Sequence, residues 1–224
     1  MKYSAAVYIF ILSCFFTSDI YSQRLDKFSY ESAGTDYKLT YAKVVTYFGY
    51  IEPGSKPDEI INGKNFYYLY FRISDTIPEM GVRIISPVPY VVMPDRGDLV
   101  SDNYFDNEKD KTNYFDPWIA IERASGFNQN NFSKNDTSLK WLLIDFNDDS
   151  SELSEQPSGK SYNALLRIKP KQKDLSHQLI PGLYRIAFTD DKKGIVKGSF
   201  VIQLGTALKL HGLRLESNPE KLAE

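Results

Sequence analysis

The sequence predicts an all-β protein, an antiparallel sandwich or barrel with long loops. Residues with high strand propensity are abundant, including sixteen Tyr and fourteen Phe. Short runs of these residues alternate with turns rich in Pro and Gly, and no long amphipathic helical pattern interrupts them. At 224 residues the chain is long enough to bury the core of one domain.

Eight segments carry the strand pattern. The run 66–73 is strongly aromatic, and alternation sends its successive residues to opposite faces. One set therefore belongs to the core, and the other is an outer packing row or a binding face. Runs 183–189 and 195–204 are joined by a short polar connection ending at Gly194, which predicts a hairpin. The predicted strands are residues 39–50, 66–73, 82–86, 118–124, 139–145, 162–168, 183–189 and 195–204.

Composition changes divide the chain into four parts. Residues 1–22 predict an export signal, because Lys2 precedes a short apolar run over 3–12. Residues 23–36 are polar and predict a tether. Residues 37–206 form the predicted β-sandwich domain. In the tail, residues 207–224, Ser217 is the expected N-cap of a short helix, with Glu220 reaching back to it.

The single cysteine, Cys14, lies inside the export signal and excludes an internal disulfide. Two cleavages compete there. If residues 11–14 act as a lipobox, Cys14 becomes the lipidated first residue of an outer-membrane or cell-surface lipoprotein. If a signal peptidase cuts after Ser22, Cys14 is lost and the protein is periplasmic or secreted. Both alternatives predict an exported protein.

An acidic cluster follows the apolar run of strand 139–145. It contains Asp145, Asp148 and Asp149, with Asp116 upstream and Tyr162 downstream. Two His and one Cys are too few for a nitrogen or sulfur zinc site, whereas carboxylates and other hard oxygen ligands suit Ca²⁺. The alternative is an ordinary solvated charge cluster.

Other candidate sites are weaker. Asp98 and Asp102 could serve a second cation site, but Asp at such positions usually caps local backbone N–H groups in turns. His177 and His211 are isolated, and no Ser or Cys lies in a nucleophile motif, so the sequence predicts no enzyme. The net charge of −2 predicts no nucleic-acid partner.

Several stretches, in order along the chain, resemble the major outer-membrane surface lipoprotein family of leptospires, also called haemolysis-associated protein, and its marine bacterial relatives. The resemblance spans nearly the whole mature chain. The matching segments are residues 47–50 with 53–54, 67–70, 79–87, 97–102, 115–116, 118–119, 122–123, 162–163, 182–186, 196–201 and 217–220.

The resemblance implies a jelly-roll-like β-sandwich, a lipid anchor to the outer membrane and no enzyme activity. It also implies one Ca²⁺ site, whose family positions fall here on Asp116, Pro117, Asp148, Asp149 and Tyr162. Where the family has Thr, this chain has Pro117, which offers only its carbonyl oxygen. The family's Asp run is thinned here by Phe146 and Asn147.

Two functional hypotheses follow. The first is a non-enzymatic, adhesin-like surface lipoprotein that binds extracellular-matrix proteins such as fibronectin, laminin and collagen, with loops stabilised by Ca²⁺. The alternative is a carbohydrate-binding or carbohydrate-active jelly-roll protein. Both hypotheses leave open whether the protein forms a homo-oligomer through an exposed edge strand.

Overall fold

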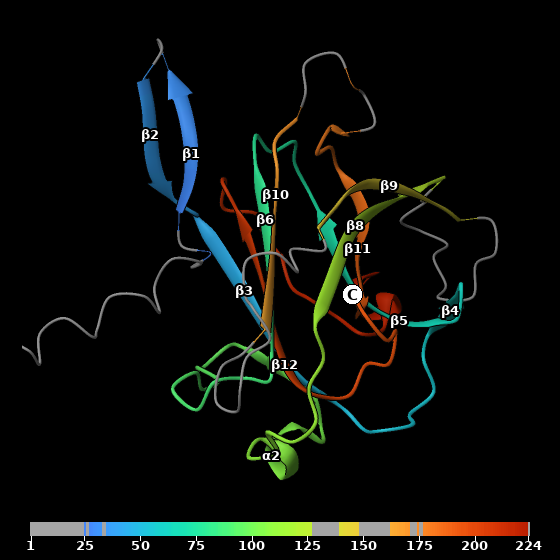
Figure 1. Cartoon of the computed structure of the whole chain (residues 1–224). Coiled ribbons are helices and arrows are strands. Elements are labelled where there is room, and N and C mark those ends of the chain that lie inside the picture. Colours follow the sequence, from blue (N-terminus) through green and yellow to red (C-terminus); the bar gives the residue numbers. More distant parts are fainter. Residues whose placement is uncertain are drawn as a thin grey trace, which may run out of the picture.

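Two packed β-sheets form the body of the protein in this computed structural model, which describes residue 25 and residues 27–32, 35–126, 139–147, 162–170, 174 and 177–223 (Figure 1). Among these residues each main sheet has five strands. The first sheet contains β3 (Lys43–Ile51), β6 (Met80–Ser86), β7 (Leu99–Val100), β10 (Tyr162–Ile168) and β12 (Gly198–Thr206). The second sheet contains β4 (Glu59–Ile61), β5 (Lys64–Ile73), β8 (Pro117–Ser125), β9 (Lys140–Asn147) and β11 (Gly182–Asp190).

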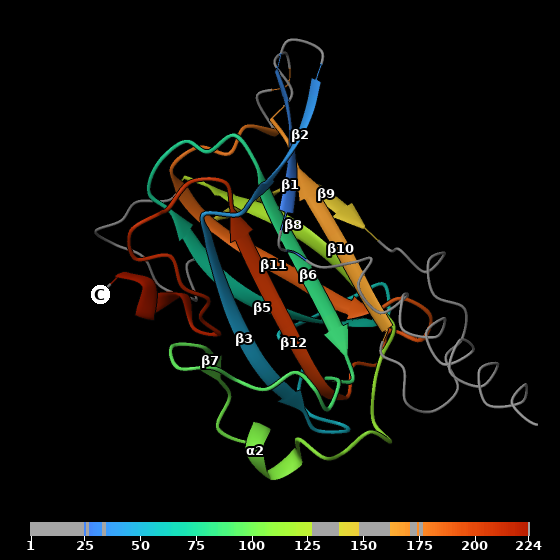
Figure 2. The ribbon, with the colours of Figure 1, turned by 90° about the vertical axis from the view of Figure 1, so that its left-hand side faces the viewer.

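The strand order is β10-β6-β12-β3-β7 in the first sheet and β4-β5-β11-β8-β9 in the second. All neighbours pair antiparallel except the two-residue strand β7, which runs parallel to β3. In Figure 2 strands β3, β12, β6 and β10 lie side by side across the face of the first sheet. The predicted all-β sandwich is confirmed.

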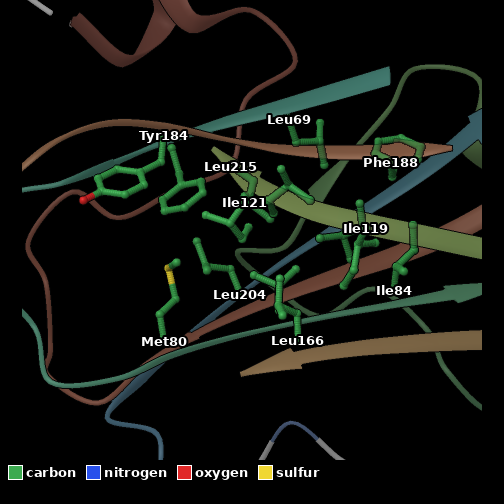
Figure 3. Packing of buried hydrophobic residues seen from close by; sticks show 14 of the residues in the cluster. Leu69, Met80, Ile84, Ile119, Ile121, Leu166, Tyr184, Phe188, Leu204 and Leu215 are labelled. Atoms are coloured by element: carbon green, nitrogen blue, oxygen red, sulfur yellow. The ribbon is translucent and has the colours of Figure 1, made fainter. Parts of the chain in front are cut away.

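The core lies between the two sheets, where alternate residues of each strand meet. Met80, Ile84 and Leu204 of the first sheet face Ile119 and Ile121 of the second, and none of the five is measurably exposed (Figure 3). Burying such side chains stabilises the fold by about 1.5–3 kcal/mol each. The core therefore fixes which face of every strand points inward and which is left for the surface.

The aromatic strand β5 divides its residues between the two faces as alternation requires. Leu69 and Phe71 belong to the core, whereas Tyr68 and Tyr70 pack on the outer face with Ala120 and Ala187. Leu222 of the C-terminal 3₁₀ helix η2 (Pro219–Ala223) packs against this outer cluster. The outer set is therefore largely a packing row, with Tyr68 and Tyr70 each only 5% exposed.

The predicted hairpin of 183–189 with 195–204 is wrong. Strand β11 pairs with β5 and β8 in the second sheet, whereas β12 pairs with β3 and β6 in the first. The connection between them therefore crosses from one sheet to the other. The buried side chain of Val196 belongs to the core cluster, so the connection also helps to close the sandwich.

The region predicted as a tether, 23–36, differs from the structure from Lys27 onward. Residues Lys27–Ser32 form strand β1, which pairs antiparallel with β2 (Thr35–Thr40). This two-stranded sheet leads directly into β3 and projects beyond the end of the sandwich (Figure 1). Polar, Gly-containing sequence predicted coil, but regular pairing satisfies the backbone of these residues.

The described chain contains little helix. One short helix, α2 (Tyr104–Asn107), lies in the loop between β7 and β8. The predicted C-terminal helix is the 3₁₀ helix η2, and its cap is Asn218, whose Oδ1 accepts a hydrogen bond from the Glu220 N–H at 3.1 Å. The cap therefore lies one residue after Ser217. In the part of the chain that the structure describes, no helix is long and apolar enough to span a membrane.

Candidate functional site

Strand ends from both sheets meet at one end of the sandwich, which we call the pocket end. It contains the last residues of β3, β6, β9 and β11 and the first residues of β8, β10 and β12. A pocket of about 580 Å³ opens there, and its lining includes Pro53, Tyr114, Asp116, Tyr162, Lys193 and Lys197. Residues distant in the sequence are thus brought together by the antiparallel topology.

The structure brings the described members of the predicted calcium set to this end. Asp116 and Tyr162 line the same pocket, and Pro117 is the first residue of β8, opposite Asp190 of β11. Strand β9 ends at Asn147, which pairs with Ile119 of β8. The chain thus leaves the sandwich at the pocket end and re-enters it there at Tyr162.

Three predicted site residues lie outside the described residues. Asp148 and Asp149 immediately follow Asn147, and Cys14 lies within the N-terminal segment. At the edge of that gap, Asn147 Nδ2 donates a hydrogen bond to the Leu165 carbonyl at 2.6 Å, which links β9 to β10 across the seam between the sheets.

Asp190 fixes the geometry of the pocket. Its carboxylate accepts hydrogen bonds from the Asp116 N–H at 3.1 Å, from the Gly194 N–H at 3.1 Å and from the Lys193 N–H. In return the Asp191 N–H donates to the Asp116 carbonyl at 2.7 Å. A carboxylate that accepts several backbone N–H groups joins the segments that carry them. Asp190 therefore ties the 191–197 connection to the segment that presents Asp116.

Gly198 allows these two segments to approach closely. Its φ is +96°, a conformation that favours glycine, and an added Cβ would lie 1.9 Å from the carbonyl oxygen of Asn113. Any larger residue at Gly198 would push the connection away from the 112–116 segment and widen the pocket.

The Asp116 carboxylate is a mostly buried charge at the pocket. Its side chain is 12% exposed, and its ion-pair partner is Lys192, whose Nζ lies 3.5 Å from Oδ2 and whose side chain is 52% exposed. Burial raises the pKa of Asp116, Lys192 lowers it, and the neighbouring Asp191 and Asp190 raise it further. An additional cation beside Asp116 would relieve this cost.

The oxygen atoms near the pocket are suitable ligands for a hard cation, but they form only part of a site. Asp116 offers a carboxylate, Tyr162 a phenol and carbonyl, and Pro117 a carbonyl, all oxygen ligands of the kind that Ca²⁺ takes. Within the described ranges, however, no group of three or more His, Cys, Asp or Glu is arranged to hold a metal. A complete site would need the carboxylates of Asp148 and Asp149.

Lysine and tyrosine side chains make up the other side of the pocket. Lys193 is exposed and Lys197 is partly exposed. The Tyr114 and Tyr162 rings stack with centroids 5.6 Å apart and an interplanar angle of 16°, and Tyr114 is 41% exposed. Sequence reasoning missed Tyr114, Lys193 and Lys197 as site residues, although 190–194 was recognised as a polar turn.

Two of the other candidates, Asp98 and His177, make local contacts in the structure. The Asp98 carboxylate accepts the Asp95 N–H at 2.8 Å, which is the turn chemistry that the sequence favoured. His177 Nδ1 lies 2.6 Å from Asp174 Oδ2, and neither residue lines the pocket.

The comparisons with known proteins identify the family. A protein-family model described as Lipl32, surface lipoprotein of Spirochaetales order, matches residues 35–215. This range covers both sheets and the pocket end. Among curated proteins no match was found. The match agrees with the family and the exported, surface location expected from the sequence, and the chain therefore belongs to the Lipl32 family of surface lipoproteins of the order Spirochaetales.

Proposed function

We propose that this surface lipoprotein is a non-enzymatic, adhesin-like binding protein whose pocket end is stabilised by Ca²⁺. The observation that carries the proposal is the meeting of Asp116, Pro117 and Tyr162 with the end of β9 at one end of the sandwich. Asp148 and Asp149 are the next two residues after Asn147, so the sequence supplies two more carboxylates where the described set is incomplete.

Ca²⁺ would act mainly by compensating charge. The mostly buried Asp116 carboxylate has the half-exposed Lys192 as its ion-pair partner among the described residues, and Asp148 and Asp149 would add two further negative charges. A divalent ion held by several oxygen ligands would join the 112–117 segment to both ends of the 147–162 connection. Ordering loops before a partner arrives lowers the entropic cost of binding.

The pocket carboxylates support a binding role over a hydrolytic one. A glycoside hydrolase needs two carboxylates free to act on either side of a bond. Here the oxygens of Asp190 accept backbone N–H groups, and Asp116 is paired with Lys192. The described lining therefore offers Asp116 no second free carboxylate to act with, because Asp190 holds the backbone around it.

Thermal unfolding tests the calcium site. Saturating Ca²⁺ should raise the Tm of the mature protein by several degrees, because an ion at about 100 times its Kd stabilises the folded state by about 2.7 kcal/mol. Asp148→Asn/Asp149→Asn and Asp116→Asn should each abolish the rise. Asp98→Asn, in a turn outside the pocket, should keep it. A wild-type Tm unchanged by Ca²⁺ would remove calcium from the proposal.

Adhesion is tested separately with immobilised fibronectin, laminin and collagen, the partners that the family resemblance implies. We expect saturable binding that is stronger in Ca²⁺ than in EGTA, because the ion preorganises the loops. Lack of saturable binding to all three matrix proteins under both conditions would contradict the adhesive function, whatever the result of the calcium titration.

A further inference from the structure

We infer that the pocket binds an anionic sugar unit of a sulfated or carboxylated polysaccharide, through Lys193, Lys197 and the ring of Tyr114. The inference rests on the proposed function in one respect, that the chain is a binding protein at the cell surface. It does not require Ca²⁺. It names the chemistry of a partner that the matrix-protein proposal leaves undefined.

The charge of the pocket favours an anion. Of the charged side chains in its lining, Asp116 is paired with Lys192, and the Asp190 carboxylate accepts the N–H groups of Asp116, Lys193 and Gly194. Lys193 and Lys197 make no ion pair with any described residue. Because these hydrogen bonds leave the Asp190 charge in place, the described lining has three lysines against two aspartates, a net charge of +1. Lys193 and Lys197 are the ammonium groups available to a sulfate or carboxylate group.

The uncharged part of the lining favours a ring. Tyr114 is 41% exposed and rests against Tyr162, which holds its plane in place. Pro53 and the 55% exposed Ile195 add apolar surface to the same pocket. Ligand pockets typically combine such apolar walls with a few oriented polar groups. A pyranose ring has an apolar C–H face and peripheral substituents, so it matches both parts of this lining.

The backbone of the pocket makes an acidic peptide a poorer fit. Peptide recognition commonly relies on main-chain hydrogen bonds with an exposed strand or loop. Here the N–H groups of Asp116, Asp191, Lys193 and Gly194 are used internally, by Asp190 and by the Asp116 carbonyl. Side-chain cations and an aromatic ring are the groups left for recognition.

The test measures binding of the mature protein to short heparin fragments, hyaluronan and neutral dextran by calorimetry at 150 mM salt, with Ca²⁺ and with EGTA. We expect the two anionic polysaccharides to bind in both buffers and dextran not to bind. Lys193→Ala/Lys197→Ala should weaken heparin binding about tenfold or more, because it removes both unpaired cations.

Matched variants distinguish specific binding at the pocket from nonspecific electrostatic attraction. Lys140→Ala/Lys209→Ala removes the same net charge from two exposed lysines outside the pocket lining, and should change the affinity less than about twofold. Tyr114→Ala should weaken binding, whereas Tyr114→Phe should retain it. A Tm measured for each variant confirms that it is folded.

Three results would overturn the inference. They are no heparin or hyaluronan binding in either buffer, equal losses for the two double-lysine variants, and polyglutamate binding as tightly as heparin without sensitivity to Tyr114→Ala. These results are distinct from failure of the proposed calcium site, which is reported by the Tm change with Ca²⁺. Loss of matrix-protein binding with retained heparin binding would likewise contradict only the adhesive proposal.

Discussion

The two ends of the sandwich each hold a carboxylate of low exposure, but they differ in the partners that surround it. At the pocket end, Asp116 lies beside a hollow and has one exposed lysine as its ion-pair partner. At the other end, which we call the closed end, the side chain of Glu79 is 3% exposed. Its Oε1 accepts a hydrogen bond from the Tyr41 hydroxyl at 3.1 Å, and Arg167 and Lys169 lie within 4 Å of it.

Two glycines explain how the closed end is filled. Gly81 of β6 and Gly205 of β12 are paired on adjacent strands of the first sheet. Tyr41 and Leu25 occupy the space that their missing side chains leave. Tyr41 is 5% and Leu25 4% exposed. The segment leading into the domain is therefore packed against the closed end, whereas the pocket end keeps open space beside polar groups. At Gly81 and Gly205 the closed end therefore lacks the kind of open space found at the pocket end.

The largest effect is expected from breaking the pocket end at Asp190. Asp190→Ala leaves the N–H groups of Asp116, Lys193 and Gly194 without their acceptor and should lower the free energy of unfolding by about 3–5 kcal/mol. Urea denaturation measures the change. Asp191→Ala is the matched control, because its carboxylate accepts no hydrogen bond among the described residues. Equal losses for the two variants would contradict the role given to Asp190.

A smaller effect is expected from overfilling the closed end. In Gly205→Ala the new Cβ would lie 2.8 Å from the ring carbons of Tyr41, so the ring must move, at a cost of about 1–3 kcal/mol. Gly182→Ala, whose Cβ would meet nothing closer than 3.8 Å, should be nearly neutral. Calcium and heparin binding should be unchanged in Gly205→Ala. A loss of either would show that the two ends are coupled.

The smallest effect concerns pH. Burial raises the pKa of both Asp116 and Glu79, despite nearby cations that lower it. Because each folded pKa lies above its unfolded value, each group's contribution to stability is present at low pH and is lost as pH rises through the folded pKa. In EGTA, Asp116→Asn and Glu79→Gln should each flatten the decline of Tm with rising pH.

Adding Ca²⁺ should distinguish the contribution of Asp116 to the pH dependence of Tm from that of Glu79. If Ca²⁺ binds Asp116, wild-type protein in Ca²⁺ should lose the Asp116 part of that decline, because the ion favours the ionised form. The Glu79 part should persist. An identical pH profile of Tm in Ca²⁺ and in EGTA would place the ion elsewhere than at Asp116.

The sequence predicted the location of most strands because each carries its own local evidence. The predicted run 162–168 coincides with β10, and 66–73 lies within β5. Alternation also divided the β5 residues correctly between core and outer face. In contrast, β4 and β7 were missed, because strands of three and two residues are too short to show a pattern.

The candidate site was predictable only in part. Asp116 and Tyr162 were noted beside the acidic cluster and Pro117 came from the family resemblance, and the structure places the three at one end. Asp190 was read as part of a hairpin turn, because sequence does not reveal that β11 and β12 belong to different sheets. Lys193, Lys197 and Tyr114 could not be predicted as one site, because only the tertiary structure brings them into the same pocket.

The amino-acid sequence by itself determined that this chain is all-β and belongs to a family of exported surface lipoproteins, because strand propensity and family motifs are local properties. Tertiary structure decided which strands pair, that 191–197 crosses between sheets, and that one end is filled while the other is open. These outcomes depend on how two sheets pack and on contacts between residues far apart in the chain, which no local pattern encodes.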